Sequence, residues 1–436
     1  MKEIHKAYKF RFYPQEDLKI LLAKTFGCSR FVYNKILELS EQHYQTKYLD
    51  QDKNQINPNY KNLTSTDRVN WIIQLKQEND WLSEVSSVAL QQSVRHLNTA
   101  YDRFFKHNAS KPTFKKKNNK NSFTINGKSS LRFDQDFIKN KKFYLPKYDK
   151  PLNIQWSQSF NHLNVSSVTI SKEPSGKYFI SFLVKELIQS KKENLNQKIS
   201  IDLGLKTHVK IYDGKTFQDQ QLPKSIQKIE KRIRKEQRVL NRREKSSKNR
   251  NKQRLIVARL HEKRNNIIQD FYQKLSSKII NDNQELKIED LGIKNLMRNR
   301  KLSHKIQQVA WGRFIHMLEY KAQWNERIIT KANRYYPSSK LCHDCGKIYD
   351  GLKLSERQWA CQHCGAQHDR DENACLNLYD YDGTTYLLLR KNRNHQKSSK
   401  PVGATVCGGN VRPKSSKKIV SEKTEAVSNE ARIHVL

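Results

Sequence analysis

The sequence contains no apolar run long enough to cross a membrane, which excludes a membrane-spanning helix. Its first residues, Met1-Lys-Glu-Ile-His, do not resemble a secretory signal peptide, and no amphipathic anchor or lipidation signal is present. A regular internal repeat is also missing, which argues against a repeat architecture. We therefore expect a protein of the cytoplasm with no membrane partner.

Acidic residues are scarce relative to basic ones. The chain has 43 Asp and Glu against 83 Lys and Arg, so its formal net charge is +40. With 10% aromatic residues, this excess makes nucleic acid the natural partner. A length of 436 residues is enough for roughly two to four domains with cores of their own.

Seven cysteines are present, and four of them form two Cys-x-x-Cys pairs, Cys342 with Cys345 and Cys361 with Cys364. The fifteen residues between the pairs predict one Zn²⁺ held by four thiolates, and the glycine after each pair suits a tight turn. A redox pair or two disulfides are the alternatives, and both fit poorly with a chain that lacks a secretion signal. Because four thiolates leave no open position, we expect this zinc to be structural.

The hydrophobic period changes along the first half of the chain. Residues 7–13 alternate as a half-buried strand whose outer face carries Lys9 and Arg11. Helical patterns follow from about residue 16, and five strand candidates come after them: 122–126, 142–146, 152–156, 168–170 and 178–184. We expect an N-terminal antiparallel β-barrel of residues 1–15 and 107–192, with a helical lobe inserted at 16–106 that includes helices around 68–82 and 86–106.

The second half begins with two paired strands over 198–214 and has a further strand at 285–289. Between them, residues 224–279 have the pattern of a helical hairpin with 19 Lys and Arg against 5 acidic residues. A solvated coiled coil is the alternative, but the imbalance of charge favours a nucleic-acid groove. We expect one helix over 306–333, with five apolar residues facing inward: Trp311, Phe314, Leu318, Trp324 and Ile328.

Three carboxylates stand at the ends of predicted elements. Asp202 lies in a predicted strand, Glu289 closes another, and Asp371 precedes a predicted helix. Hydrolysis of a phosphodiester with two magnesium ions needs such a cluster of oxygen ligands, which only the fold can assemble. Asp290 and Asp369 are neighbouring candidates, and a helix cap is the structural alternative for Asp369 and Asp371.

The order of these motifs resembles the TnpB family, the RNA-guided nucleases of small bacterial and archaeal transposons, which are related to compact type V CRISPR effectors. The ordered set is a strand Asp, a basic helical insert, a strand Glu, a four-Cys ribbon and His-Asp-Arg-Asp371-x-Asn. Three further segments are similar to the family: Tyr-Lys-Phe-Arg-Phe-Tyr-Pro14, Gly27-Cys-Ser-Arg30-Phe-Val-Tyr33-Asn34 and Tyr336-Pro-Ser-Ser-Lys340. The likeness covers roughly residues 7–390.

The resemblance implies an α/β multidomain protein with a RuvC-like RNase H fold, a mixed sheet flanked by helices. It implies that Asp202, Glu289 and Asp371 are the catalytic triad and hold two Mg²⁺. Cys375 departs from the family pattern, in which alanine is common at this place, but a small residue is kept. The implied domains are a RuvC-like domain at 193–335 including the hairpin, a zinc ribbon at 336–366, the end of the nuclease at 367–389 and a disordered basic tail at 390–436.

The resemblance also implies a function. It is that of a Mg²⁺-dependent DNA endonuclease of a transposon that binds a structured guide RNA and cleaves double-stranded DNA beside a short adjacent motif, in a single RuvC-like site. No protein oligomer is required, and the expected location is the prokaryotic cytoplasm, at the nucleoid. Candidate nucleic-acid contacts are Lys9, Arg11, Arg30, Arg232, Arg243 and Arg370.

Two other functions remain open. A transposase-type strand-transfer enzyme is permitted by the same three acids, although the family's transposition chemistry belongs to a separate partner. A non-catalytic RNA-guided DNA-binding protein is the second alternative, and the presence of all three acids weighs against it.

Overall fold

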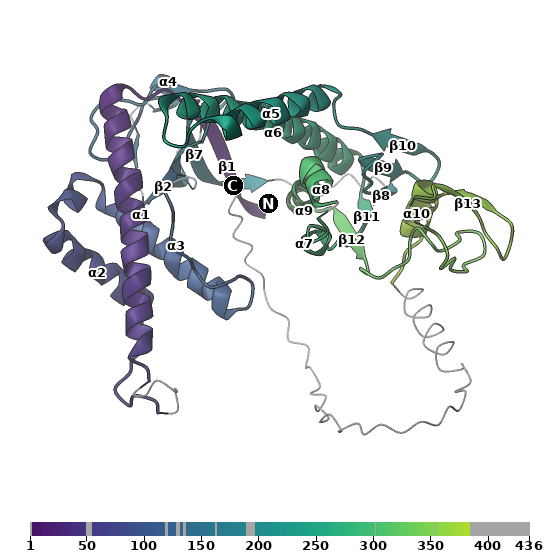
Figure 1. Ribbon diagram of the computed structural model, residues 1–436, viewed down its shortest axis with the longest axis horizontal. Coiled ribbons are helices and arrows are strands. Elements are labelled where there is room, and N and C mark those ends of the chain that lie inside the picture. The colour runs from purple at the N-terminus through teal and green to yellow at the C-terminus, as the bar shows by residue number, and fades with distance from the viewer. Residues whose placement is uncertain are drawn as a thin grey trace. The chain divides into compact units, whose positions relative to one another are not determined.

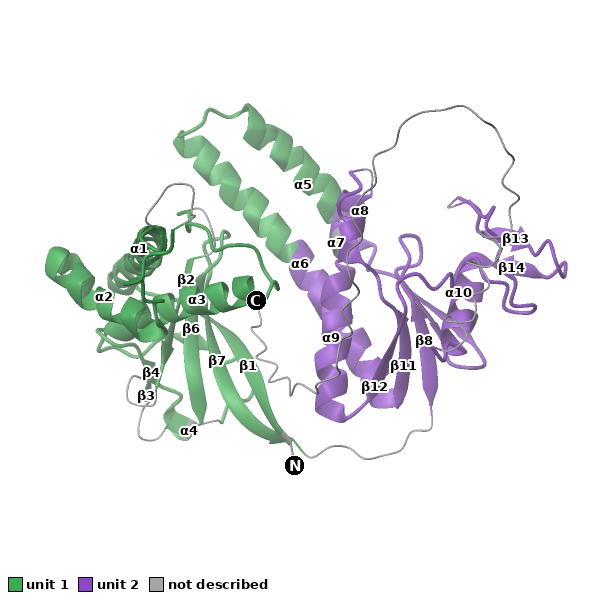
Figure 2. Cartoon of the chain, turned by 90° about the horizontal axis from the view of Figure 1, so that it is seen from below, with its two compact units in different colours: residues 1–189, 229–263 green, residues 190–228, 264–436 purple. Residues whose placement is uncertain are grey.

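The computed structural model describes residues 2–48, 55–117, 121–127, 131–133, 137–161, 164–188, 197–300, 302–353 and 355–383. The chain divides into two compact units, coloured separately in Figure 2: Met1–Gln189 with Ile229–Lys263, and Ser190–Lys228 with Arg264–Leu436. No helix in the described ranges is long and apolar enough to cross a membrane. The basic tail expected at 390–436 lies outside the described residues.

The first unit contains a five-stranded antiparallel sheet in the order β2-β6-β7-β1-β5. Its longest pair is β1 (Lys2–Phe12) and β7 (Tyr178–Ile188). The remaining strands are β2 (Asn121–Asn126), β5 (Ile154–Gln155) and β6 (Val165–Lys172). The predicted first strand is confirmed, since Tyr8, Phe10 and Phe12 are all buried on one face. The predicted barrel is not confirmed: among the described strands β2 and β5 are free edges of an open sheet.

Helices follow β1, as predicted. They are α1 (Glu16–Gln45), α2 (Ser65–Glu78) and α3 (Ser87–Phe105), with a short 3₁₀ turn at Asp80–Glu84. Apolar residues at helical spacing on α1 and α3 form a core of their own: Val32, Ile36, Leu90, Val94 and Leu97. Small elements β3 (Arg132–Phe133), α4 (Phe137–Asn140) and β4 (Phe143–Tyr144) complete this unit's β region.

The second unit contains a mixed sheet in the order β10-β9-β8-β11-β12. Its strands are β8 (Lys198–Asp202), β9 (Val209–Tyr212), β10 (Phe217–Gln220), β11 (Glu285–Glu289) and β12 (Ile328–Ala332). β8, β11 and β12 run parallel to one another, whereas β9 and β10 are antiparallel. The strand order is that of a mixed α/β sheet, whose strands are labelled in Figure 1.

Successive side chains of each strand point to opposite faces of this sheet, and helices cover both faces. Ile199, Ile201 and Ile288 point to a core that includes α6 (Lys248–Asp282) and α9 (Trp311–Asn325). Ser200 points to the other face, where its hydroxyl donates to the Cys375 carbonyl at 2.7 Å on α10 (Arg370–Tyr379). Figure 2 shows α9 and α10 on either side of the strands.

The predicted basic hairpin is present as α5 (Ser225–Arg242) and α6. Its tip, Ile229–Lys263, belongs to the first unit, and the rest belongs to the second. In the second unit Tyr272 of α6 is fully buried, and its hydroxyl donates to the Val309 carbonyl at 2.7 Å. This bond ties α6 to the end of α8 (Ser303–Val309).

The single helix predicted over 306–333 is wrong. The segment forms the end of α8, then α9, and finally strand β12; a short helix α7 (Ile293–Leu296) precedes them. Glu326 has a positive φ of 54° and ends α9, after which Ile328-Ile329-Thr330 is a β-branched run that favours a strand. Trp311, Phe314 and Leu318 are buried as predicted, whereas Ile328 is 56% exposed.

Candidate active site and metal centre

Asp202 and Glu289 occupy the last positions of two neighbouring parallel strands. Because Ile201 lies opposite Ile288, the two acids come next to each other at the carboxyl edge of the sheet. Alternation places both on the face opposite the apolar core, which is the face that α10 covers. Lys287, two residues before Glu289, confirms this direction because its ammonium donates to the Tyr381 carbonyl just beyond α10.

Asp371 lies in the first turn of α10. Asp369 is the N-cap of that helix, and its carboxylate accepts from the N–H groups of Asp371 at 3.0 Å and Glu372 at 3.1 Å. The capping role therefore falls to Asp369, which leaves the Asp371 carboxylate for another task. Asp290 is also engaged elsewhere, since it pairs with Arg334 at 2.8 Å.

The charges of Glu289 and Asp371 both act on the Asp202 carboxyl. Burial, which is the largest cause, and the charges of Glu289 and Asp371 together raise the pKa of Asp202 to about 7. Burial also raises the pKa of Glu289, with a contribution from Asp290. Arg370 acts against both shifts. Crowded acids with raised pKa values favour a bound cation, which would remove their mutual repulsion.

Arg357 is a site residue that the sequence analysis missed. Its Nη1 donates to both carboxylate oxygens of Asp371, at 2.6 and 2.9 Å, and the Asp371 side chain is only 15% exposed. The residue lies between the two cysteine pairs, where no motif marks it, so only the fold brings it to Asp371. A cation bound by Asp371 has to share this carboxylate with Arg357 or displace it.

Lys210 is a second residue that the sequence did not single out. It lies opposite Asp202 on β9, and it is 7% exposed. Its ammonium pairs with Asp219 at 3.1 Å and with Glu372, the neighbour of Asp371, at 3.2 Å. A lysine between Val209 and Ile211 in a buried strand is the one signal that could have drawn attention to it.

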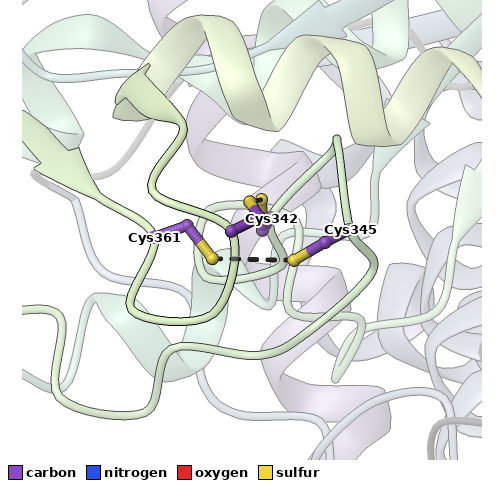
Figure 3. A group of neighbouring side chains, drawn as sticks. Cys342, Cys345 and Cys361 are labelled. Atoms are coloured by element: carbon purple, nitrogen blue, oxygen red, sulfur yellow. Dashed lines mark hydrogen bonds between the residues drawn. The ribbon is translucent and has the colours of Figure 1, made fainter.

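The four predicted zinc ligands come together. Among the described residues, Cys342, Cys345, Cys361 and Cys364 are the set whose ligand atoms all lie within 4.8 Å of one another, and the three carboxylates are not gathered that closely. Figure 3 shows the sulfur atoms of this four-cysteine centre turned toward a common point. Their separations of 3.7 Å (Cys342 to Cys364) and 3.6 Å (Cys345 to Cys361) are far too long for disulfides, whose sulfur–sulfur bond is about 2.05 Å.

The sulfur geometry fits a tetrahedral ion. A zinc–sulfur bond of about 2.3 Å places two tetrahedral ligands about 3.8 Å apart, close to the separations found here. Both turns have the same form: Gly346 (φ 67°) and Gly365 (φ 76°) each donate an N–H to the carbonyl of the first cysteine of their pair, at 2.9 Å. His368 stays outside the quartet, with Nε2 at 3.0 Å from the Cys342 sulfur.

The candidate nucleic-acid contacts are spread over both units. In the first unit Lys9 pairs with Glu173 at 3.4 Å, Arg11 lies over the ring of Tyr13, and Arg30 is a half-exposed residue of α1. Arg232 is exposed on α5, and Arg243 donates to the Asn249 carbonyl at 2.5 Å. In the second unit the charge of Arg370 opposes the raised pKa values of Asp202 and Glu289. The structure holds no nucleic acid, so these contacts stay predictions.

A family described as a probable transposase matches residues 170–300, a Cas12f1-like TNB domain matches 311–378, and a helix-turn-helix domain matches 1–47. A Streptomyces pristinaespiralis protein named "Putative RNA-guided DNA endonuclease" is 35% identical over 87% of this chain and 89% of its own length. The Escherichia coli K12 protein "Putative RNA-guided DNA endonuclease InsQ" is 26% identical over 85% of this chain and 91% of its own.

Among solved structures, a Cas12f1–sgRNA–target DNA complex aligns with 87% of this chain and 99% of its own at 13% identity, with a TM-score of 0.47. The sequence relatives decide the classification. The ordered acids, the four-cysteine centre and the 35% identity over most of both chains place this protein in one family with the Streptomyces pristinaespiralis protein. This chain belongs to the TnpB family, as the resemblance of its motifs predicted.

Proposed function

We propose that this protein is an RNA-guided DNA endonuclease encoded by a transposon. The observation that carries the proposal is that Asp202 and Glu289 end adjacent parallel strands on the sheet face that α10 covers, and that the charge of Asp371 in the first turn of α10 contributes to the raised pKa of Asp202, about 7. The names of its full-length relatives support the same activity. Guide RNA and double-stranded target DNA are the partners that follow from it.

In this role the three acids are the catalytic residues and hold two Mg²⁺. When bound, the ions activate the attacking water and stabilise the leaving oxygen of the phosphodiester. Asp202 and Glu289 supply oxygen ligands from a rigid sheet edge, whereas Asp371 supplies one from a helix N-terminus. Arg357 balances the charge of Asp371 until a cation does so. The four-cysteine centre holds one Zn²⁺ that builds structure.

The first experiment is to express the gene with its downstream flanking DNA, purify the protein in high salt and sequence any RNA that remains bound. A discrete RNA that runs past the 3′ end of the gene is expected. The complex is then tested for cleavage of DNA that carries a sequence complementary to the guide and a randomised neighbouring motif. Retention of no RNA, together with binding of bare DNA, would favour the strand-transfer alternative.

The Asp202→Asn variant distinguishes a nuclease from a binder. We expect it to lose more than about 10³-fold in cleavage rate while target binding stays intact, because a carboxylate ligand of the cations is gone. Asp270→Asn is the matched control, since Asp270 is an exposed residue of α6 that pairs with nearby Lys274. If Asp202→Asn binds the target DNA and also cleaves it as the parent does, the catalytic assignment of Asp202 is wrong.

A further inference from the structure

Helix α10 carries two buried asparagines one turn apart. Asn373 is 1% exposed and Asn377 is 4% exposed, so neither amide is satisfied by water. Both Nδ2 groups donate to the Leu341 carbonyl at 2.7 Å, and both donate to the Ser338 carbonyl, at 3.3 Å from Asn373 and 2.8 Å from Asn377. Residues four apart lie on the same helix face, which lets both amides bond the same two carbonyls.

The other end of the Asn373 amide completes the contact. Its Oδ1 accepts the N–H of His343 at 3.1 Å. Leu341 and His343 are the two residues on either side of Cys342, so the two asparagines hold the backbone directly around a ligand of the four-cysteine centre. We call the two side chains and these bonds the asparagine clamp.

Simple helix packing does not explain the clamp. Apolar side chains would fill the same space, and buried amides stabilise only when their groups are paired. Here the amides donate and accept at set positions, and such a satisfied network fixes one arrangement of two segments. The segments are the first cysteine turn and the helix whose first turn holds Asp371, two residues before Asn373.

A second contact joins the same two parts of the molecule. The N–H of Arg370 donates to the Arg357 carbonyl at 2.6 Å, and the Arg357 side chain holds Asp371. Arg357 lies just before β13 (Gln358–Ala360), which pairs with β14 (Gln367–Asp369) next to the second cysteine turn. The start of α10 is thus attached to the segment around each cysteine pair.

We propose that the asparagine clamp couples the metal of the four-cysteine centre to cation binding at the active site. When the four cysteines hold their ion, the first turn is fixed, and the clamp then fixes the position of α10 and of Asp371. Asn373 and Asn377 are positioning residues in this scheme, since they touch neither substrate nor cation. The inference rests on the proposed role of Asp371 as a cation ligand.

Asn377→Leu is the sharpest variant because Asn377 lies six residues from Asp371 and the substitution removes the two bonds that its amide donates, to the Ser338 and Leu341 carbonyls. The full-length protein with its guide RNA is loaded with Zn²⁺, and bound Zn²⁺ is counted by elemental analysis. Mn²⁺ binding is then followed by the loss of the free-ion EPR signal. We expect one Zn²⁺ per chain to remain and the affinity of the Asp371-dependent Mn²⁺ site to fall by about 10- to 100-fold, the usual effect of removing a supporting contact of a metal ligand.

Two comparisons interpret this result. Asp371→Asn defines which Mn²⁺ binding belongs to the active site, and Asn325→Leu is the matched control, since Asn325 donates to the Lys321 carbonyl of its own helix. If Asp371→Asn leaves Mn²⁺ binding unchanged, the proposed function loses its cation site. If Asp371→Asn weakens it but zinc-loaded Asn377→Leu does not, only the clamp proposal is overturned.

A reciprocal measurement covers the case in which Asn377→Leu loses zinc or does not fold. Coupling between two binding sites is reciprocal. Saturating Mn²⁺ must therefore raise the Zn²⁺ affinity of the unmodified protein by the factor by which bound Zn²⁺ raises its Mn²⁺ affinity. This affinity is measured by competition with a chromogenic chelator, with and without Mn²⁺, and with Asp371→Asn as the reference. Equal Zn²⁺ affinities in both conditions would overturn the proposal without any variant of the clamp.

Discussion

Asp202 shows at the scale of one residue how function opposes stability. Its carboxylate ends a strand directly after the buried Ile201, and burial together with the charges of Glu289 and Asp371 raises its pKa in the folded chain from 3.8 to about 7. Such an arrangement costs free energy of folding unless a cation is bound. The same arrangement favours binding of a cation, because the bound ion would remove the repulsion between the acids.

The first prediction concerns the stability of the cation-free protein. Because the pKa of Asp202 is raised from 3.8 to about 7, the folded chain keeps a proton that the unfolded chain has lost between these pH values. The stability that this proton contributes is complete below pH 3.8 and is lost as the pH rises through 7. Asp202→Asn removes the loss, so its advantage over the parent should grow over this range and reach at most about 4 kcal/mol.

The measurement is the thermal unfolding of the second unit in both proteins, from pH 5 to 8. The buffer contains neither chelators nor divalent cations. Asp270→Asn, on an exposed position, should show no such growth. A constant difference between Asp202→Asn and the parent over the whole range would contradict the assigned pKa of Asp202.

A second prediction concerns the pH dependence of cation binding. A divalent ion binds the ionised form of Asp202, and so it must displace the proton that this group holds below about pH 7. At subsaturating Mg²⁺ the cleavage rate should therefore fall by up to about tenfold per pH unit below 7. Saturating Mg²⁺ should shift the midpoint to lower pH, and a midpoint that ignores the ion concentration would exclude this linkage.

At the scale of elements, the sequence predicts the structure best where the hydrophobic period of a segment and the spacing of its motif residues indicate the same structure. The cysteine turns follow from spacing alone, because four thiolates and two glycines leave one compact arrangement. β8 and β11 followed from short apolar runs, and their parallel pairing brings Asp202 beside Glu289. By contrast, the apolar residues of β12 continue the helical period of α9 and so predict a helix, although the β-branched run Ile328-Ile329-Thr330 favours the strand that forms.

The rest of the candidate site depends on contacts between elements that are distant in the sequence. Arg357 reaches Asp371 because β13 and β14 pair beside α10, and Lys210 reaches Glu372 because β9 runs under the same helix. No motif marks Arg357, and the local signal for Lys210 is limited to its place between Val209 and Ile211. The predicted barrel is not confirmed for a similar reason, since alternation predicts strands but not whether the two edge strands of a sheet meet.

A third prediction concerns the contact between α6 and α8. Tyr272 is fully buried, and its hydroxyl is the partner of the Val309 carbonyl. Tyr272→Phe leaves that carbonyl without its donor and should lower the free energy of unfolding of the second unit by about 1 to 3 kcal/mol. Tyr320→Phe is the control, because Tyr320 is partly exposed and its bond to Gln273 is longer, at 3.2 Å. Equal losses for the two variants in denaturant titrations would contradict this account.

At the scale of the whole molecule, the excess of positive charge is the main observation. In the absence of a polyanion, a net charge of +40 would destabilise the folded chain through repulsion between its basic residues. The basic residues of α5 and α6 lie on a hairpin with only a narrow apolar stripe. Fields of this size attract any nucleic acid, so charge alone cannot give a guided nuclease its selectivity. Selectivity has to come from the folded shape of the guide and from base pairing.

The final prediction follows from this division. Binding of unrelated RNA should weaken steeply with salt, because each phosphate contact releases a counterion; six to ten contacts correspond to a loss of about 10³- to 10⁵-fold between roughly 50 and 200 mM salt. Binding of the guide RNA should have a similar slope but a tighter affinity at every salt concentration, since its shape-dependent contacts add a term that salt does not screen. Filter binding of both RNAs over this range measures the two slopes. Two lines that coincide would mean that the chain binds RNA by charge alone, and the non-specific binder would become the better description.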